Sequence, residues 1–175
     1  MNKIFLVLLL FTFVSCASNP KYKTKNLTEE SSPVKKRVLR KIVPKKEEST
    51  KFSQKGMEEE IKTWLGTPYH WGGTTKEGVD CSGFVLKVFH NSANQKLPRV
   101  SRDMYKVGKA VPRDKLKFGD LVFFQGFSNK RVSHVGIFLG EEKFAHASST
   151  YGVIYSHLYQ SYYKKRYIGA KRVLN

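Results

Sequence analysis

The spacing of apolar residues divides the chain into stretches with different patterns. Residues 4–14 form an apolar run with Thr12 as its one polar residue, IFLVLLLFTFV, and the next forty residues hold few large apolar side chains. Helical spacing then occurs twice, in MEEEIKTWLG (57–66) and in CSGFVLKVFHNSA (81–93), where apolar residues recur three or four positions apart. From residue 120 onward the apolar residues occur in short β-branched or aromatic runs between Gly, Asn and Ser. That last pattern is typical of antiparallel strands.

These patterns predict an α+β domain. The first helix has three acids near its start and is expected to end at Gly66. The second is expected to begin at Cys81, with Asp80 as its N-cap. The segment between them, TPYHWGGTTKEGVD, is predicted to be a loop because of its Pro and Gly. About five strands are expected after the helices, from DLVFF, HVGIFLG, KFAHAS, GVIYS and YIGAKRV, which places the folded domain at residues 56–175.

The N-terminal apolar run has the composition of a secretory signal peptide, predicted over residues 1–15. One Lys precedes the run and small residues follow it, and the run is shorter than the roughly 20 residues that a membrane-spanning helix needs. The sequence FVSC, which ends at Cys16, resembles a bacterial lipobox with Phe13 in place of the usual leucine. We therefore expect Cys16 to be lipidated and to anchor the protein to a membrane. The alternative is an ordinary signal peptide that is cleaved nearby.

Residues 16–55 are predicted to be a flexible linker, since they are rich in Lys, Ser, Glu and Pro. Residues 17–55 hold twelve Lys or Arg and four Glu, so this stretch contributes +8 to the formal net charge of +18. Such a charge favours contact with anionic lipid head groups or wall polymers, at about 1 kcal/mol per basic residue. Nucleic acid is not expected as a partner, because the export signal directs the protein to the envelope and no nucleic-acid module surrounds the basic residues.

Cys81 is a candidate nucleophile. The chain has two cysteines, so lipidation of Cys16 leaves no partner for an intramolecular disulfide. An unpaired thiol in an oxidising compartment is prone to oxidation, which favours a chemical role over that of a small buried residue. A nucleophilic thiol needs a lowered pKa, and the free N–H groups at the start of the second predicted helix favour its ionised form. Asp80 would oppose ionisation if its charge pointed at the sulfur.

Two histidines are predicted to lie near each other on a β-hairpin. His134 begins the strand HVGIFLG, His146 lies in KFAHAS, and the short turn GEEK places both at the open end of the hairpin, roughly opposite one another. One could accept the thiol proton of Cys81 while the other orients it. A zinc site is the alternative use of these residues. No metal is expected, because the C-x-x-C, H-E-x-x-H and H-x-H spacings do not occur. The remaining histidines are predicted to be surface or loop residues: His70, His90 and His157.

Six motifs follow one another in the order and spacing of the NlpC-type cell-wall cysteine peptidases: GTPYHWGG, DCSGFV, LPRVSRDMY, GDLVFF, HVGIFLG and FAHAS. The chain resembles that family over residues 57–172. The resemblance implies a papain-like α+β fold in which Cys81 at a helix start faces histidines from an antiparallel sheet. It also implies that Cys81 is the nucleophile, that His134 is the general base, and that His146 orients His134.

The same resemblance implies substrate-binding roles for four residues. The Tyr69 hydroxyl would bind substrate or help stabilise the oxyanion, Asp80 and Ser82 would contact the free amine of a stem peptide, and Arg102 would hold a substrate carboxylate. The family acts without a cofactor on peptidoglycan peptides, commonly between D-glutamate and a diamino acid, and some members cut cross-links. We therefore expect a monomeric, lipid-anchored peptidoglycan hydrolase of the cell envelope, on the outer membrane or the periplasmic face. The alternatives are a non-catalytic wall-binding scaffold and an amidase or acyltransferase acting on another amide.

Overall fold

The computed structural model describes residues 52–126 and 130–174, so the predicted signal peptide, Cys16 and almost all of the predicted linker lie outside the described residues. Within these ranges, no helix combines the length and the apolar composition that a membrane span requires. The helices are α2 (Gln54–Trp64), α3 (Cys81–Ala93), α4 (Ser101–Met104), a 3₁₀ turn η1 (Arg113–Lys115) and α5 (Ser161–Arg166). The strands are β1 (Thr74–Thr75), β2 (Gly78–Val79), β3 (Lys109–Val111), β4 (Leu121–Gln125), β5 (Val132–Gly140), β6 (Lys143–Ser148), β7 (Gly152–His157) and β8 (Tyr167–Arg172).

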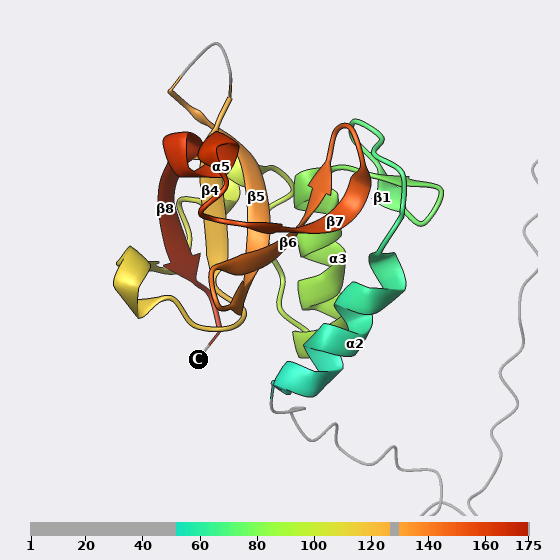
Figure 1. Ribbon diagram of the computed structural model, residues 1–175. Helices are drawn as coiled ribbons and strands as arrows, with labels where there is room; N and C mark the ends of the chain where they lie inside the picture. Colours follow the sequence, from blue (N-terminus) through green and yellow to red (C-terminus); the bar gives the residue numbers. More distant parts are fainter. Residues whose placement is uncertain (1–51, 127–129, 175) are drawn as a thin grey trace, which may run out of the picture. The chain divides into compact units, whose positions relative to one another are not determined.

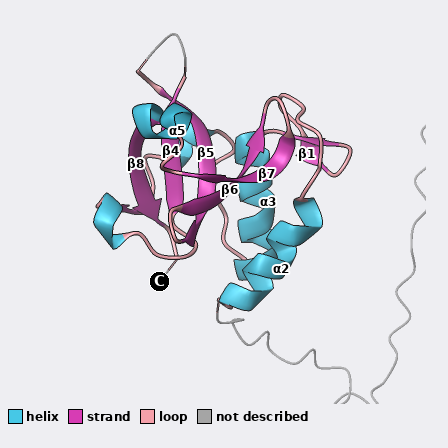
Figure 2. Ribbon diagram, in the orientation of Figure 1, coloured by secondary structure: helices cyan, strands magenta, loops and turns pink. Residues whose placement is uncertain are grey.

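The second half of the chain forms an antiparallel six-stranded sheet in the order β3-β8-β4-β5-β6-β7 (Figures 1 and 2). The five predicted strands correspond to β4–β8, and the α+β fold class is confirmed. The additional strand β3 was not predicted, because it is only three residues long, largely exposed, and paired with β8 at the sheet edge. The predicted loop before α3 contains the two-residue strands β1 and β2, which are too short to give an alternating pattern.

The two long helices begin at side-chain caps. As predicted, α3 begins at Cys81, because the Asp80 carboxylate accepts a hydrogen bond of 2.6 Å from the Gly83 N–H. Helix α2 begins at Gln54, three residues before the predicted start, because Ser53 Oγ accepts a bond of 3.3 Å from the Gly56 N–H. The acids of α2 therefore lie beyond its first turn, and the predicted stabilisation of that turn by acidic side chains was wrong.

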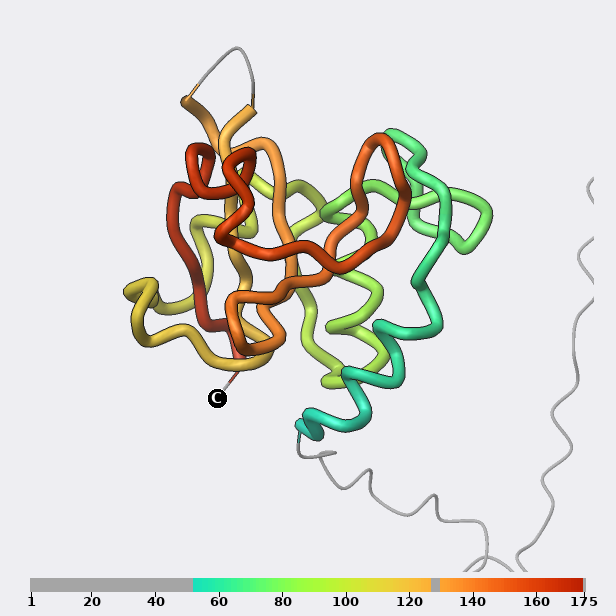
Figure 3. Tube along the Cα trace, viewed as in Figure 1, coloured from blue at the N-terminus to red at the C-terminus, as the bar shows by residue number. Residues whose placement is uncertain are grey.

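Helices cover both faces of the sheet. On one face α3 packs against β5 and β6, and α2 packs on α3, while α5 lies over the other face beside β4 (Figures 1 and 3). Alternate residues of β4 face opposite sides of the sheet. Leu121 and Phe123 pack in the core beneath α3, and Val122 and Phe124 pack in a second cluster with Tyr163 of α5. Burial on both faces explains why β4 is an unbroken apolar run.

The loop before α3 lies directly against the start of that helix. The Asp80 N–H donates to the Gly73 carbonyl at 3.2 Å, and a Cβ on Gly83 would stand only 2.3 Å from the same carbonyl oxygen. A side chain at Gly83 would therefore push the loop away from the helix. The glycine of the DCSG motif thus keeps the PYHWGG loop beside the residue that begins α3, Cys81.

Candidate active site

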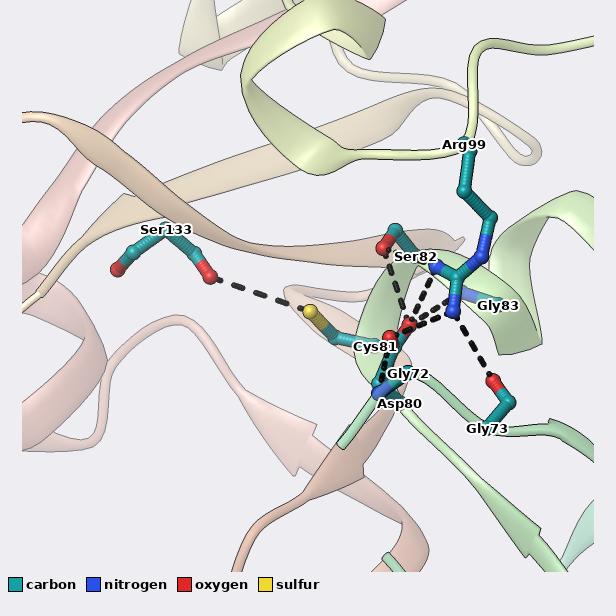
Figure 4. Close-up of polar contacts among 8 residues, drawn as sticks. All are labelled: Gly72, Gly73, Asp80, Cys81, Ser82, Gly83, Arg99 and Ser133. Carbon is teal, nitrogen blue, oxygen red and sulfur yellow. Dashed lines mark hydrogen bonds and ion pairs between the residues drawn. The ribbon is translucent and has the colours of Figure 1, made fainter. Parts of the chain in front are cut away.

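The Cys81 sulfur lies against β5, the strand that carries His134. Cys81 is 6% exposed, and its Sγ is 3.9 Å from the carbonyl oxygen of Ser133, toward which it points in Figure 4. The Val135 N–H also reaches the sulfur closely enough to act on its pKa. The peptide groups on both sides of His134 therefore contact the sulfur, and the predicted pairing of a helix-start cysteine with this strand is present in the fold.

Burial dominates the ionisation of the thiol. It raises the pKa of Cys81 to about 11, and the Asp80 charge acts in the same direction. Backbone N–H groups, including those of Val135 and Ser82, act in the opposite direction but do not outweigh burial. The N–H groups at the helix start thus favour the ionised thiol, as expected, but burial outweighs them, and Cys81 is a neutral thiol at neutral pH in the free protein.

His134 and His146 are hydrogen-bonded across the predicted hairpin. Nε2 of His134 is 2.9 Å from Nδ1 of His146, and the rings are nearly perpendicular at 87°. Ile137 pairs with Ala145, which places His146 opposite Gly136, so the two histidines are diagonal neighbours rather than direct cross-strand partners. A Cβ on Gly136 would stand 2.6 Å from Phe144 Cδ2, 2.8 Å from the Ala145 carbonyl oxygen and 3.3 Å from the His146 Cβ. The missing side chain at Gly136 therefore lets β6 lie close to β5 where it carries His146.

The hydrogen bond between the rings limits which nitrogen can act as a base. Because Nε2 of His134 is bonded to His146, Nδ1 is the His134 nitrogen that can accept a proton. Burial lowers the pKa of His134 to about 4. Burial, together with His134, also holds the pKa of His146 well below its ordinary value. Both rings are therefore neutral at neutral pH, and a His134 with its lone pair on Nδ1 donates its Nε2–H to His146.

Two hydroxyl groups lie behind His146. Its Nε2 is 3.0 Å from Ser156 Oγ on β7 and 3.2 Å from the Tyr163 hydroxyl on α5. His146 accepts at Nδ1, so its Nε2–H points at these two oxygens. Neither residue was predicted from the sequence. Ser156 is a buried serine two positions beyond Ile154, the residue opposite His146, and recognising it requires the strand register.

Asp80 lies at the centre of a second polar network (Figure 4). The Arg99 guanidinium donates to both carboxylate oxygens, at 3.0 Å and 2.8 Å, and Ser82 Oγ donates at 3.0 Å. Burial acts to raise the pKa of Asp80, but the hydrogen bonds from Arg99, the Gly83 N–H and Ser82 outweigh it and hold this pKa below its ordinary value. Asp80 is therefore a charged residue whose two oxygens already have donors within the protein.

Arg99, rather than Arg102, joins this network. Both occur in the motif LPRVSRDMY, but Arg99 precedes α4 and reaches back to Asp80, whereas Arg102 is exposed on α4. Arg99 also donates to Ser82 Oγ at 3.0 Å and to the Gly73 carbonyl at 3.3 Å. Arg99 was not predicted from the sequence. Its position in the same motif was the available signal, but the motif alone does not show which arginine points inward.

A cavity of about 690 Å³ opens beside the histidine pair. His134 and His146 form part of its wall, together with Tyr69 from the loop and Tyr163 from α5. Asp80 does not line this cavity. Burial, and secondarily Cys81 and Asp80, raise the pKa of Tyr69 to about 12. The Tyr69 hydroxyl therefore remains protonated and able to donate a hydrogen bond.

The other histidines do not line the cavity. His70, His90 and His157 are exposed, as predicted. In the part of the chain that the structure describes, no three His, Cys, Asp or Glu side chains are grouped so that they could hold a metal ion. The structure thus brings together Cys81 with the strand of His134, the histidine pair with its two hydroxyls, and Asp80 with Ser82 and Arg99.

Similar proteins share this fold. Over 112 residues the chain is 46% identical to the murein DD-endopeptidase MepS/murein LD-carboxypeptidase of Escherichia coli strain K12, which covers 64% of this chain and 58% of that protein. It is 39% identical over 118 residues to the probable endopeptidase NlpC of the same strain, covering 67% of this chain and 77% of that protein. A crystal structure of an NlpC/P60 family protein from Bacillus cereus matches with a TM-score of 0.67 and 32% identity, covering 73% of this chain and 42% of that one.

The chain thus spans little more than half the length of MepS, at 58%. The structural similarity confirms the expected papain-like fold. Residues 66–172, more than half of the chain, match the NlpC/P60 family, and the chain therefore belongs to the NlpC/P60 family.

Proposed function

We propose that this protein is a cysteine peptidase that hydrolyses peptide bonds in the stem peptides or cross-links of peptidoglycan. The observation that supports this most strongly is the contact of the Cys81 sulfur with the peptide groups on both sides of His134, a residue hydrogen-bonded in turn to His146. The substrate class is supported by the relatives named as murein endopeptidases. The bond proposed is the one between D-glutamate and a diamino acid, or a related bond.

In the proposed mechanism, His134 accepts the thiol proton while the sulfur attacks. The pKa values of about 11 for Cys81 and about 4 for His134 make the neutral pair the resting form, so the proton moves to Nδ1 of His134 as the C–S bond forms. The Cys81 N–H and the Tyr69 hydroxyl are the proposed donors to the oxyanion. The imidazolium then protonates the leaving amine, and water hydrolyses the thioester to release the acid and restore the thiol.

The other proposed roles concern substrate and location. Asp80 and Ser82 would contact the free amine of the stem peptide at the edge of their network, and Arg102, which is exposed on α4, would hold a substrate carboxylate. Lipid on Cys16 would attach the protein to the outer membrane or the periplasmic face of the envelope. A flexible linker of about 40 residues would then span roughly 35 Å and let the domain sample nearby wall.

Digestion of purified peptidoglycan by the full chain tests the proposal. Mass spectrometry should detect new soluble peptide fragments, and their masses would identify the bond. The control is the same digestion by the full-chain Cys81→Ala protein, which should release nothing. Release of no fragments by folded, reduced protein would contradict the proposal. Co-sedimentation of that protein with the wall would then favour a scaffold.

The two hydroxyls behind His146 give a prediction about turnover. Replacing both, as Ser156→Ala with Tyr163→Phe, should lower kcat by roughly 10- to 100-fold and leave KM nearly unchanged, because His146 would lose the acceptors that fix its tautomer and orientation. Each single variant should have a smaller effect. Tyr159→Phe, an exposed tyrosine outside the cavity, is the matched control and should behave like the wild type. A change confined to KM would show that the hydroxyls act on substrate binding instead.

A further inference from the structure

Two exposed aromatic side chains line the cavity beside the histidine pair. Trp71, in the loop between α2 and β1, is 84% exposed, and Tyr151, in the turn between β6 and β7, is 72% exposed. Among the described residues, these are the two most exposed large hydrophobic side chains. Aromatic rings left in water at the wall of a cavity favour a ligand that covers them.

Backbone hydrogen bonds hold the loop of Trp71 in place. The N–H of His70 donates to the Val79 carbonyl at 3.2 Å. The N–H of Gly72 donates to a carboxylate oxygen of Asp80 at 3.0 Å. Both neighbours of Trp71 are therefore bonded to the residues that precede α3. The Trp71 ring is thus presented from a fixed backbone, which limits the loss of chain entropy when a ligand binds.

The turn of Tyr151 lies against the start of the same loop (Figures 1 and 3). The N–H of Val153 donates to the Thr67 carbonyl at 2.9 Å. A Cβ on Gly152, whose φ is 70°, would stand 2.3 Å from the same carbonyl oxygen, so only glycine allows this contact. Ser148 Oγ accepts a bond of 3.3 Å from the Tyr151 N–H, which fixes the turn itself. The two exposed rings are therefore carried by adjoining segments of fixed backbone.

The part of the cavity wall that these two segments form is polar but carries no formal charge. It contains no Asp, Glu, Lys or Arg and consists of Tyr69, Trp71, Ser148, Ser149, Thr150 and Tyr151. Hydroxyl groups beside flat aromatic faces suit a neutral ligand that has hydroxyl or amide groups and an apolar face. In peptidoglycan the stem peptides carry carboxylates and amines, whereas the sugar rings carry hydroxyl and acetamido groups and present C–H faces. The sugar is therefore the part of the substrate that matches this wall.

The Asp80 network is compatible with a sugar on the stem peptide. Its carboxylate already accepts hydrogen bonds from four residues: Arg99, Ser82, Gly72 and Gly83. The ion pair with Arg99 also balances its charge. A stem peptide whose N-terminus is joined to a sugar through an amide therefore leaves no charge of this network unpaired. Peptides with a free amine and peptides attached to glycan can both be accommodated.

We propose that Trp71 and Tyr151 stack against sugar rings of the glycan strand, and that the enzyme thereby prefers stem peptides that are still attached to glycan. The hydroxyls of Ser149 and Thr150 supply hydrogen bonds to the hydroxyl and acetamido groups of the same sugars. This inference rests on the proposed function, because that function makes peptidoglycan the substrate.

Kinetics with two matched substrates test the inference. The full chain is assayed on a stem tetrapeptide that is linked to the disaccharide of peptidoglycan, and on the same tetrapeptide with an N-terminal lactyl group in place of the sugars. The wild type should have a kcat/KM roughly 5- to 20-fold higher on the sugar-linked peptide. Trp71→Ala and Tyr151→Ala should each bring this ratio toward one, mainly by raising KM for the sugar-linked peptide.

Two further variants provide the controls. Tyr159→Ala removes an exposed tyrosine outside the cavity and should retain the wild-type ratio. Tyr151→Phe keeps the ring without the hydroxyl, so its ratio should stay close to that of the wild type. A wild-type ratio near one, or a ratio that Trp71→Ala and Tyr151→Ala leave unchanged, would overturn the inference.

Tryptophan fluorescence separates this inference from the proposed function, because it needs no turnover. The chain has two tryptophans, and Trp64 is 3% exposed, so quenching by acrylamide reports mainly on Trp71. In the full-chain Cys81→Ala protein, the sugar-linked peptide should protect Trp71 from the quencher, and the lactyl peptide should protect it much less. This result would support the sugar site even if the wild type cuts neither peptide, in which case the proposed function fails for these substrates.

The same measurement distinguishes the other molecules that could cover Trp71. Equal protection by the two peptides would mean that the stem peptide itself covers the ring. Protection by phosphatidylglycerol vesicles but by neither peptide would mean that the ring contacts a membrane. Either result would overturn the sugar site, as would the absence of any protection.

Discussion

Exchange of Cys81 for alanine is expected to lower kcat for peptide hydrolysis by about 10⁴-fold or more, because no acyl-enzyme can form without the sulfur. Binding of peptidoglycan peptides should survive, since the cavity walls belong to other residues. The change should also leave the fold intact, because alanine fills a space close to that of this 6% exposed side chain. Kinetic assays with a synthetic stem peptide, together with thermal unfolding, measure both effects.

Cys81→Ser is the informative companion to this variant. The serine hydroxyl has nearly the shape of the thiol but is a much weaker nucleophile, so the activity of this variant should be close to that of Cys81→Ala. Cys16→Ala in the assay with soluble peptide is the control, because it removes the other cysteine and should retain full turnover. Hydrolysis by Cys81→Ala at a rate near that of the wild type would require another nucleophile and would reject the mechanism.

The parts of the site that were predictable depend on local sequence. The start of α3 at Cys81 follows from Asp80 as its cap, and the histidine hairpin follows from the GEEK turn between two apolar runs. The turn is formed as the pattern indicates, with Glu141 and Glu142 at φ values of 50° and 58°. Short-range hydrogen bonds and turn geometry determine these features, so the sequence is sufficient to locate them.

The features that were missed depend on register and burial. Ser156 contacts His146 only because β6 and β7 pair in one particular register. Tyr163 contacts His146 from α5, the helix that follows β7 in the chain. The helix start lowers the pKa of Cys81 as the local sequence indicates, but the larger effect of burial, which raises this pKa, comes from packing against β5 and could not be predicted. Long-range packing thus determines which hydroxyls bind His146 and whether Cys81 is protonated, whereas the main residues of the site are recognisable from motifs.

Replacing Arg99 with glutamine should reduce the free energy of unfolding by about 2–3 kcal/mol. The variant removes two donors from the Asp80 carboxylate, which is only 11% exposed, and leaves a charge that the remaining hydrogen bonds stabilise less well. The expected loss lies below that for fully buried pairs, because the Arg99 side chain is 38% exposed. Arg102→Gln, at an exposed residue on the same motif, should change stability by less than about 0.5 kcal/mol.

The pH dependence of this loss distinguishes the ion pair from general packing. Arg99 helps to hold the pKa of Asp80 below its ordinary value. The contribution of the ion pair to the free energy of unfolding is therefore fully present above a pH of about 4, and it is lost as the pH falls through the lowered pKa of Asp80 in the folded protein. The stability difference between the wild type and Arg99→Gln in urea denaturation should therefore narrow on acidification. Asp80→Asn should make the Arg99→Gln change nearly neutral at pH 7. If this stability difference stays constant with pH, or persists in the Asp80→Asn background, Arg99 acts by packing. The charge of Arg99 would then not stabilise the start of α3.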